Sequence, residues 1–430
     1  MSLKIKNVEF LHGEKELLKG DILIENGKIT GFNTEKEKTS LMAEREIDGE
    51  KCLALPGLVN CHTHAGMVYT RGYADDKPLM TWLEDYIWPL EARLTPEDIY
   101  WGTLLAITEM LASGTTTFTD MYFAMDKAGE AVEQSGIRAV LTWGLIGLQD
   151  NAIEKLEKTV EFAREWRGAA NGRIQTMLAP HAPYTCPPPF MEKVLQKAAQ
   201  NDLPIHIHLA ETRDEIEQME KEYGKTPVKW ALDIGVFENK TLAAHCVHLN
   251  EEDINILKEK QVGVAYNPQS NMKLASGVAP IVKLLENEIK VGFGTDGPGS
   301  NNSLDMFSEM KMGSFLQKVT SKKSQNLPAG TVINMATGRG AEIIGLGSEI
   351  GSLQKGKKAD IILLNLDKPH LTPIFDPLAH VVYSCRGSDV QTTIVDGNIL
   401  YHKGEFHTLD VEKIKWEVRK RTERLTKKKK

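Results

Sequence analysis

Two pairs of histidines in this chain are spaced two residues apart, His62 with His64 and His206 with His208. Because successive side chains of a strand point to opposite faces, residues two apart point the same way. Each pair therefore places two imidazoles on one face, and neutral imidazoles are common ligands of divalent metals. The apolar run before the first pair, Leu-Pro-Gly-Leu-Val-Asn, is typical of a buried strand. This first pair is therefore predicted to bind a metal ion.

Two acidic residues complete this chemistry. Glu211 follows His208 by three residues, and a hydrolytic metal site needs a proton carrier nearby. His208 is nearer the end of its strand and is the predicted third ligand, whereas His206 is expected to be a hydrogen-bonded histidine of the core. Asp296 is followed by Gly-Pro-Gly, which cannot form a helix and leaves the carboxylate exposed. The predicted ligand set suits zinc, with iron(II), manganese or nickel as substitutes: His62, His64, His208 and Asp296. This set predicts a metal-dependent hydrolase.

The elements that must position these residues alternate short apolar runs with helical stretches, the pattern of a parallel sheet covered by helices. Eight candidate strands begin at Leu58, Thr115, Arg138, Ile174, Pro204, Thr241, Val262 and Lys290. A helix is predicted between Thr95 as N-cap and Gly114 as its stop. Eight such units in about 250 residues predict a (β/α)8 barrel, an α/β fold of the TIM type.

The ends of the predicted strands carry polar residues, which a barrel would gather at one mouth. A doubly wound open sheet is the rival fold, but it would bind ligands at one switch point rather than at every strand end. The polar residues at these ends are His62, His64, Asp120, Trp143, His181, His208, Glu211, His245, His248, Asn267, Ser270 and Asp296.

The two flanks of the chain differ from its middle. Residues 2–55 and 350–406 contain short alternating runs with hairpin signals at Asn26-Gly27 and Asp396-Gly397. The two flanks are expected to pair into one small composite β-sandwich. The predicted units are 1–56, the N-terminal half of the sandwich; 57–348, the catalytic barrel; 349–408, its C-terminal half; and 409–430, a C-terminal helix and basic tail.

Composition narrows the function classes. A formal charge of −7 argues against nucleic acid as a partner, because no surplus of cations exists to neutralise phosphates. No apolar run is long enough to cross a membrane, and the N-terminus lacks the apolar region of a secretory signal. Five scattered cysteines predict reduced thiols and a cytoplasmic protein. The four lysines at 427–430 are expected to form a solvated tail.

The chain resembles the amidohydrolase superfamily and, within it, the S-adenosylhomocysteine/5′-methylthioadenosine deaminases. The resemblance covers nearly the whole chain and rests on PGLVNCHTHAGMVYTRGYADDKPLMTWLEDYIWPLE, GTTTFTDMYF, APHAPYTC, HIHLAET, AAHCVHL and GTDGPGSNNSLDMF. It implies the barrel with its composite sandwich and one divalent metal on the four predicted ligands. No lysine stands at the fourth strand end to carry a bridging carbamate, which agrees with a single metal.

The resemblance also implies residue roles in the hydrolytic deamination of a purine nucleoside at C6. Glu211 would protonate the ring nitrogen, Asp296 would act as base, and His245 would hold the attacking hydroxide. Glu91 would accept the ribose hydroxyls, and His181 would donate to the purine ring. Further candidates for lining the pocket are Trp82 and Ser300.

One departure from the family concerns the distal part of the substrate. The family commonly has an arginine where this chain has Trp143, and a second arginine is matched by Lys155. Because tryptophan cannot bind a carboxylate as arginine does, 5′-methylthioadenosine or adenosine is expected over S-adenosylhomocysteine. The alternatives are a guanine deaminase, an s-triazine chlorohydrolase, a non-catalytic scaffold and a metal-storage or sensing protein. The sequence is also compatible with a homo-oligomer.

Overall fold

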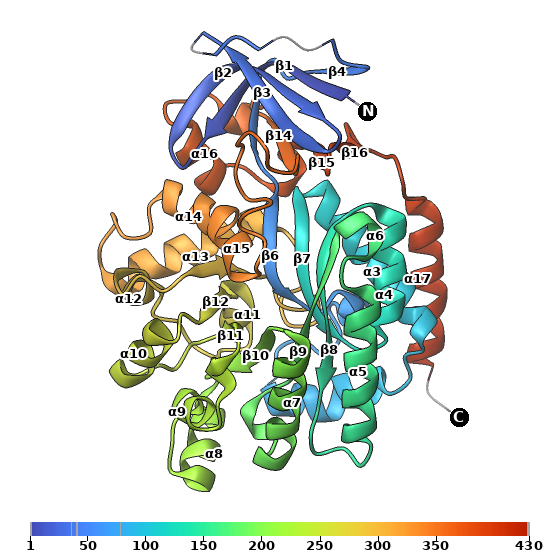
Figure 1. The fold of residues 1–430 in the computed structure, drawn as a ribbon, viewed down its shortest axis with the longest axis vertical. Coiled ribbons are helices and arrows are strands. Elements are labelled where there is room, and N and C mark those ends of the chain that lie inside the picture. Colours follow the sequence, from blue (N-terminus) through green and yellow to red (C-terminus); the bar gives the residue numbers. More distant parts are fainter. Residues whose placement is uncertain (1, 36, 40–41, 78, 428–430) are drawn as a thin grey trace.

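Eight parallel strands form the central sheet of the computed structural model, which describes residues 2–35, 37–39, 42–77 and 79–427 (Figure 1). Each strand pairs with the next along the chain, so their polar carboxyl ends meet at one edge. The strands are β6 (Leu58–Thr63), β7 (Thr115–Tyr122), β8 (Arg138–Leu145), β9 (Ile174–Pro180), β10 (Ile205–Leu209), β11 (Thr241–His245), β12 (Gly263–Tyr266) and β13 (Val291–Phe293). All eight coincide with the candidate strands of the sequence.

The first and last strands approach each other and nearly close the barrel. The backbone N–H of Asp296, just past β13, donates to the carbonyl of His62 in β6 at 2.9 Å. The side chain of Asn60 accepts from the N–H of Thr295 at 3.0 Å and donates to its hydroxyl at 2.8 Å. Gly294 is required here, because a Cβ at this position would lie 2.9 Å from the backbone nitrogen of His62. This seam brings the two ends of the barrel sequence together.

Helices cover the outside of the barrel (Figure 1). The first long one, α3, begins with the predicted capping arrangement, in which Thr95 and Asp98 each bond to the other's backbone N–H. The helices are α1 (Leu79–Trp82), α2 (Trp88–Glu91), α3 (Pro96–Ala112), α4 (Met125–Ser135), α5 (Ala152–Trp166), α6 (Ala169–Gly172), α7 (Pro188–Asn201), α8 (Arg213–Tyr223), α9 (Pro227–Asp233), α10 (Glu251–Glu259), α11 (Pro268–Lys273), α12 (Ile281–Glu286), α13 (Met306–Ser321), α14 (Ala329–Met335), α15 (Gly338–Ile343), α16 (Pro377–Tyr383) and α17 (Val411–Thr426).

A separate sheet combines strands from both flanks of the chain, as predicted, and lies above the barrel in Figure 1. The flanks join where β5 pairs antiparallel with β14, and β5 continues through Gly57 into β6. Both hairpin signals lie at turns, between β2 and β3 and between β15 and β16. The strands are β1 (Ser2–His12), β2 (Glu16–Glu25), β3 (Lys28–Thr34), β4 (Arg45–Asp48), β5 (Cys52–Pro56), β14 (Ile361–Asn365), β15 (Val390–Val395), β16 (Asn398–His402) and β17 (Glu405–Phe406).

The fold class is therefore confirmed: a nearly closed α/β barrel of eight parallel strands with a sheet built from both flanks. The four predicted unit boundaries remain a proposal. The five cysteines are all buried and unpaired. Residues 428–430 of the predicted lysine tail lie outside the described residues.

The C-terminal helix α17 is held against α3 by an ion cluster. Asp98 is fully buried, and its Oδ1 accepts from Arg421 at 3.2 Å, while Oδ2 accepts from Arg424. Oδ2 also accepts from the N–H and hydroxyl of Thr95, each at 2.7 Å. Burial opposes the charged carboxylate, but the bonds from Thr95 and Arg424 outweigh it and lower the pKa of Asp98. An ionised Asp98 therefore stabilises the folded chain.

We expect Asp98→Asn to lower the melting temperature at neutral pH and to have less effect in acid. The folded-state pKa of Asp98 is lowered, so its contribution is complete above its unfolded value of about 3.9. It is lost as pH falls through the folded-state pKa. Thermal unfolding from pH 7 to pH 3 measures the difference, with exposed Glu165→Gln as control. A difference that stays constant over this range would contradict the prediction.

Candidate metal and catalytic site

The four predicted ligands come together at the carboxyl ends of three strands, although they span residues 62 to 296. We call them the histidine–aspartate cluster. Oδ1 of Asp296 lies 3.3 Å from Nε2 of His62 and 3.2 Å from Nε2 of His64. Nε2 of His208, from β10, lies 3.3 Å from Nε2 of His64. The potential ligand atoms form two triads that share His62: His62, His64 and Asp296, and His62, His208 and His245, with the atoms of each triad within 4.8 Å of one another.

His64 and His208 each use Nδ1 for a hydrogen bond, which leaves Nε2 of each ring facing the cluster. His64 directs Nδ1 at the carbonyl of Met121, and His208 directs Nδ1 at the carbonyl of His181 at 2.8 Å. A carbonyl can only accept, so each Nδ1 donates a proton, and in the neutral ring Nε2 then offers its lone pair. Burial lowers the pKa of His64, but the neighbouring Asp296 outweighs it and raises this pKa to about 9, so a cation would displace the proton from Nε2 of His64. Nε2 of His62 is buried without a well-directed hydrogen bond. Three imidazole lone pairs and one carboxylate oxygen fit a divalent cation.

Asp296 is held in its charged form. Burial opposes ionisation, but the imidazoles of His62 and His64 outweigh it, and the pKa of Asp296 lies well below its usual range. Its second oxygen, Oδ2, accepts from the hydroxyls of Ser270 and Ser300, each at 2.6 Å. Asp296 also has a left-handed backbone with φ 59°, a conformation that clusters at functional sites.

Ser300 was predicted to line the pocket, and the structure places its hydroxyl on Asp296. Ser270 was seen at a strand end but not assigned a role. Its signal was weak, because a serine two residues into α11 resembles many helix starts. The parallel pairing of β12 with β13, after which the two residues lie, brings this hydroxyl to the carboxylate.

Glu211 lies in the turn that follows β10, with Oε2 at 3.7 Å from Nε2 of His245. Burial raises the pKa of Glu211 to about 8, and the negative charge of Asp296 adds to the effect. Glu211 is therefore protonated at neutral pH and can donate a proton. The carboxyl group of Glu215, whose pKa burial also raises to about 8, accepts from the N–H groups of Ala210 and Glu211, at 3.0 and 2.8 Å, and holds this turn in place.

Glu215 was not predicted to belong to the site. A sequence signal existed, because Thr212 and Glu215 have the spacing of a capping box. The hydroxyl of Thr212 does accept from the N–H of Glu215, at 3.2 Å. The carboxyl group of Glu215, however, bonds to the turn that carries Glu211 and not to the N-cap residue.

His245 ends β11 with a left-handed backbone, φ 75°. Burial lowers its pKa to about 4, so the imidazole is neutral. Side-chain N–H groups of Asn271 and Asn267 lie 2.9 and 3.4 Å from its Nδ1, which therefore acts as an acceptor. The proton of this neutral ring is then on Nε2, the nitrogen nearest Glu211. His245 thus offers a hydrogen-bond donor to the site.

The predicted ribose-binding residue, Glu91, ends the short helix α2. The hydroxyl of Tyr122, at the carboxyl end of β7, donates to its Oε1 at 2.6 Å. Burial raises the pKa of Glu91, although the bond from Tyr122 opposes the shift. Trp82 is buried and its ring approaches Gly299, the neighbour of Ser300. Glu91 thus contacts the carboxyl end of β7, and Trp82 contacts the loop that follows β13.

His181 follows β9 and lies beside His208, with ring centroids 4.8 Å apart. Burial lowers its pKa to about 4, so its imidazole is neutral. Nδ1 lies 3.0 Å from the hydroxyl of Thr185, which itself donates to the carbonyl of Ala182. Nδ1 therefore donates, and Nε2 is an acceptor in this arrangement. The predicted donation to a purine would require the Thr185 hydroxyl to reverse.

The two residues predicted near the distal part of a substrate differ in setting. Trp143 is half-buried near the end of β8 and packs edge-on against Phe162 of α5, with ring centroids 5.9 Å apart. Lys155 lies on α5 and its ammonium donates to Gln149. The described contacts of Lys155 do not reach the histidine–aspartate cluster.

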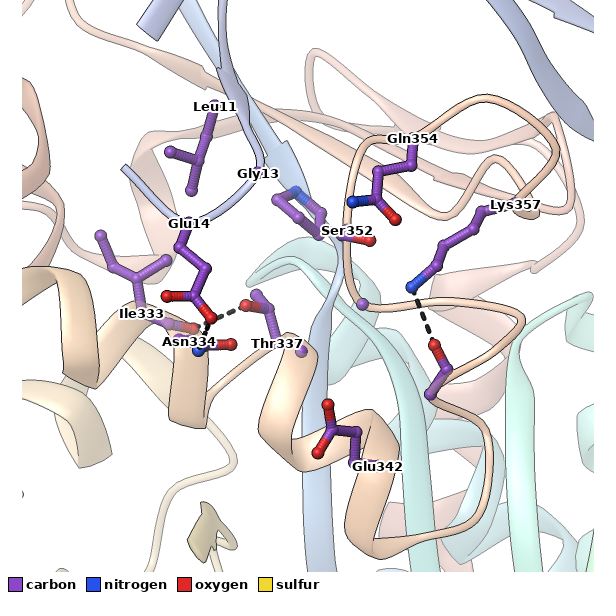
Figure 2. Close-up of a pocket in the computed structure, with 14 residues that line it drawn as sticks. Leu11, Gly13, Glu14, Ile333, Asn334, Thr337, Glu342, Ser352, Gln354 and Lys357 are labelled. Atoms are coloured by element: carbon purple, nitrogen blue, oxygen red, sulfur yellow. Dashed lines mark hydrogen bonds between the residues drawn. The ribbon is translucent and has the colours of Figure 1, made fainter. Parts of the chain in front are cut away.

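A cavity of about 210 Å³ lies between the flanking sheet and the opposite end of the barrel, lined in part by the β1–β2 turn and by α14. Figure 2 shows Glu14 there, which accepts from Asn334 at 3.1 Å, and Lys357, which donates to the carbonyl of Gly347 at 2.8 Å. The residues that line it include none of the predicted site residues. This cavity therefore lies apart from the histidine–aspartate cluster.

A barrel of eight parallel strands with three histidines and an aspartate at its mouth defines a class of metal-dependent hydrolase. The chain belongs to the amidohydrolase family, whose model matches residues 53–400. It is 52% identical over 397 residues to a 5-methylthioadenosine/S-adenosylhomocysteine deaminase of Syntrophomonas wolfei, covering 92% of each chain. It is 50% identical over 428 residues to the deaminase of the same name from Dictyoglomus turgidum, covering 100% of both.

A solved structure extends the comparison. The crystal structure of an adenosine deaminase from Xanthomonas campestris with bound zinc matches the fold with a TM-score of 0.93. It is 32% identical in sequence, and the match covers 98% of both chains. Among the described helices of the present chain, none combines the length and the apolar character that a membrane crossing requires.

Proposed function

We propose that the chain is a divalent-metal-dependent deaminase that hydrolyses the 6-amino group of adenosine-type nucleosides and releases ammonia. The observation that carries the proposal is geometric: the largely buried carboxyl group of Glu211 lies 3.7 Å from His245 and beside the histidine–aspartate cluster, where burial raises its pKa to about 8. The full-length relatives named as deaminases support the same activity. The candidate substrates are 5′-methylthioadenosine, S-adenosylhomocysteine and adenosine.

The cation would be held by the histidine–aspartate cluster. Zinc is the proposed metal, because the ligand set of three imidazoles and a carboxylate suits it and the adenosine deaminase of Xanthomonas campestris holds zinc. When bound, a divalent cation lowers the pKa of a coordinated water and supplies a nucleophile near neutral pH.

Three residues would move or hold protons during the reaction. Glu211 would donate its proton to the ring nitrogen beside C6 as the carbon becomes tetrahedral. His245 would donate from Nε2–H to the oxygen of the attacking water, since its Nδ1 is occupied by Asn271. The ionised Asp296 would take a proton from the attacking water and pass it to the leaving amine, and the C6 hydroxyl would return its proton to Glu211 as the carbonyl forms and the C–N bond breaks.

Residues around the mouth would bind the nucleoside. Glu91, fixed by Tyr122, would accept from the ribose hydroxyls. His181 would contact the purine ring, and Trp82 would enclose the pocket near the loop after β13. Ser300 would act through Asp296, and Trp143 and Lys155 would face the 5′ substituent.

Ammonia release from a panel of amines tests the function. The panel holds 5′-methylthioadenosine, S-adenosylhomocysteine, adenosine, guanine, cytidine and an s-triazine, each assayed with and without a chelator. We expect release from the adenine nucleosides, loss of activity on chelation and recovery when Zn²⁺ is restored. Release from guanine or the triazine alone would contradict the proposed substrate class.

We expect the wild-type chain to prefer 5′-methylthioadenosine over S-adenosylhomocysteine, and Trp143→Arg to shift the ratio of kcat/KM values toward S-adenosylhomocysteine by about tenfold. A bond from arginine to the substrate carboxylate is worth about 1.5 kcal/mol or more, which is about a factor of ten. Trp143→Phe, which keeps an aromatic ring on Phe162, should leave the ratio unchanged. A wild-type chain with S-adenosylhomocysteine as the clearly better substrate would refute this prediction.

A further inference from the structure

His206, predicted to be a hydrogen-bonded histidine of the core, makes its hydrogen bond to one of the predicted metal ligands. It is fully buried in β10, and its Nε2 lies 2.9 Å from Nδ1 of His62 in β6. The two strands stand four places apart in a barrel of eight, so the contact crosses the barrel interior. The rings meet edge to face at an interplanar angle of 89°. One of these two nitrogens must carry the shared proton.

The position of His62 decides which one carries it. Nε2 of His62 faces the cluster, 3.3 Å from Oδ1 of Asp296, and must keep its lone pair to bind a cation. The proton of this neutral ring is therefore on Nδ1, and Nε2 of His206 accepts it. The second nitrogen of His206, Nδ1, then carries its own proton.

That second proton also has an acceptor. Nδ1 of His206 lies 3.5 Å from the hydroxyl of Thr142 in β8. This hydroxyl donates its own proton to the carbonyl of Asp120 in β7, at 2.8 Å, so its oxygen is left to accept. His62 thus donates to His206, His206 to Thr142, and Thr142 to the backbone of β7. The side chains of all three residues are buried. The chain of bonds has one consistent direction.

We propose that His206 is a positioning residue that accepts the Nδ1 proton of His62 and so holds Nε2 of His62 toward the cation. The proposal rests on the proposed metal site. Groups that bond to the far nitrogen of a metal-binding imidazole fix its tautomer and ring orientation. Removing the acceptor would leave the Nδ1–H of His62 buried without a partner and free the ring to rotate.

The test measures cation affinity of the full chain by competition of Zn²⁺ with a chromophoric chelator. We expect His206→Leu to weaken binding by about 10- to 100-fold. His206→Gln, whose side-chain oxygen can accept from His62, should retain most of the affinity. Ile207→Val, a conservative change in the same strand, is the control for disturbance of β10. Co²⁺ binding adds a second readout, because its absorption bands report the ligand geometry and not turnover.

The outcomes separate the two proposals. Equal affinity of wild type and His206→Leu would overturn the role of His206 while leaving the metal site standing. An equal loss in the Leu and Gln variants would also overturn it, because shape and not the hydrogen bond would then matter. If His206→Leu does not fold, the Thr142→Val variant is measured instead, since it removes the acceptor of the Nδ1 proton of His206. Weaker cation binding by this variant supports the proposed role of His206, and unchanged binding overturns it. A wild-type chain that binds no cation would overturn the proposed function as well.

Discussion

Glu211→Gln is expected to lower kcat for 5′-methylthioadenosine by about 100- to 10,000-fold while the chain keeps its full content of metal. General acid catalysis contributes a factor of this size, and glutamine has the shape of glutamic acid but no transferable proton. The side chain is not among the proposed ligands, and its contact with His245 at 3.7 Å is long. The loss should therefore appear in turnover, with a small change in KM.

The matched control is Glu217→Gln, an exposed residue on α8, six positions along the chain. It makes the same chemical change outside the mouth and should leave kcat unchanged. Metal content is measured on the same samples, so that loss of the cation is not mistaken for loss of the acid. A Glu211→Gln variant with its metal bound and full turnover would remove Glu211 from the mechanism.

The fold could be predicted because each barrel strand has a recognisable local sequence pattern. Runs such as VGVAY from Val262 are apolar, short and followed by polar residues, which few other elements are. The capping residues Thr95 and Asp98 likewise act within four residues of each other. Such signals depend only on neighbours in the chain. Patterns of this kind gave the element order, and the element order implied the barrel.

The site could be predicted only where one strand carries two functional residues or a turn exposes one. His62 and His64 share a strand end, and Asp296 stands in a turn that no helix can use. The bonds from Asn271 to His245 and from Ser270 to Asp296 join separate elements 26 residues apart. Whether these two bonds form depends on how deep each side chain lies in the barrel. The spacing of residues in the sequence does not give that depth.

The segment before Glu91 shows a second limit of sequence patterns. A π-helical turn, Leu83–Ile87, connects α1 with α2 just ahead of Pro89. Proline has no N–H to donate and its ring disturbs the preceding helical turn, so a wider turn is a common solution. No helix is predicted from the sequence over these residues, because a repeat of 3.6 residues does not record a wider turn. This wider turn directly precedes the short helix that ends with Glu91.

Arg138→Met is expected to cost about 3–5 kcal/mol of the free energy of unfolding, the usual loss when one partner of a buried ion pair is removed. Arg138 begins β8 with a side chain that is 1% exposed, and Asp360, just before β14, is 2% exposed. Nε and Nη2 of Arg138 donate to the two oxygens of Asp360, at 2.8 and 3.0 Å. The pair joins the barrel to the flanking sheet. Methionine would leave the carboxylate buried without its cation.

Denaturant unfolding of four chains tests this account: wild type, Arg138→Met, Asp360→Asn and the double variant. The double variant should recover much of the loss, because it removes the uncompensated charge as well as the cation. Arg164→Met, an exposed change on α5, should cost at most about 1 kcal/mol.

All seven tryptophans lie outside the flanking-sheet segments 2–56 and 361–406, so their fluorescence follows the barrel and α17. If the pair fastens the sheet to the barrel, circular dichroism of Arg138→Met should change at lower denaturant than tryptophan fluorescence does. A loss below about 1 kcal/mol with coincident transitions would mean that packing between the two sheets, and not this pair, holds them together.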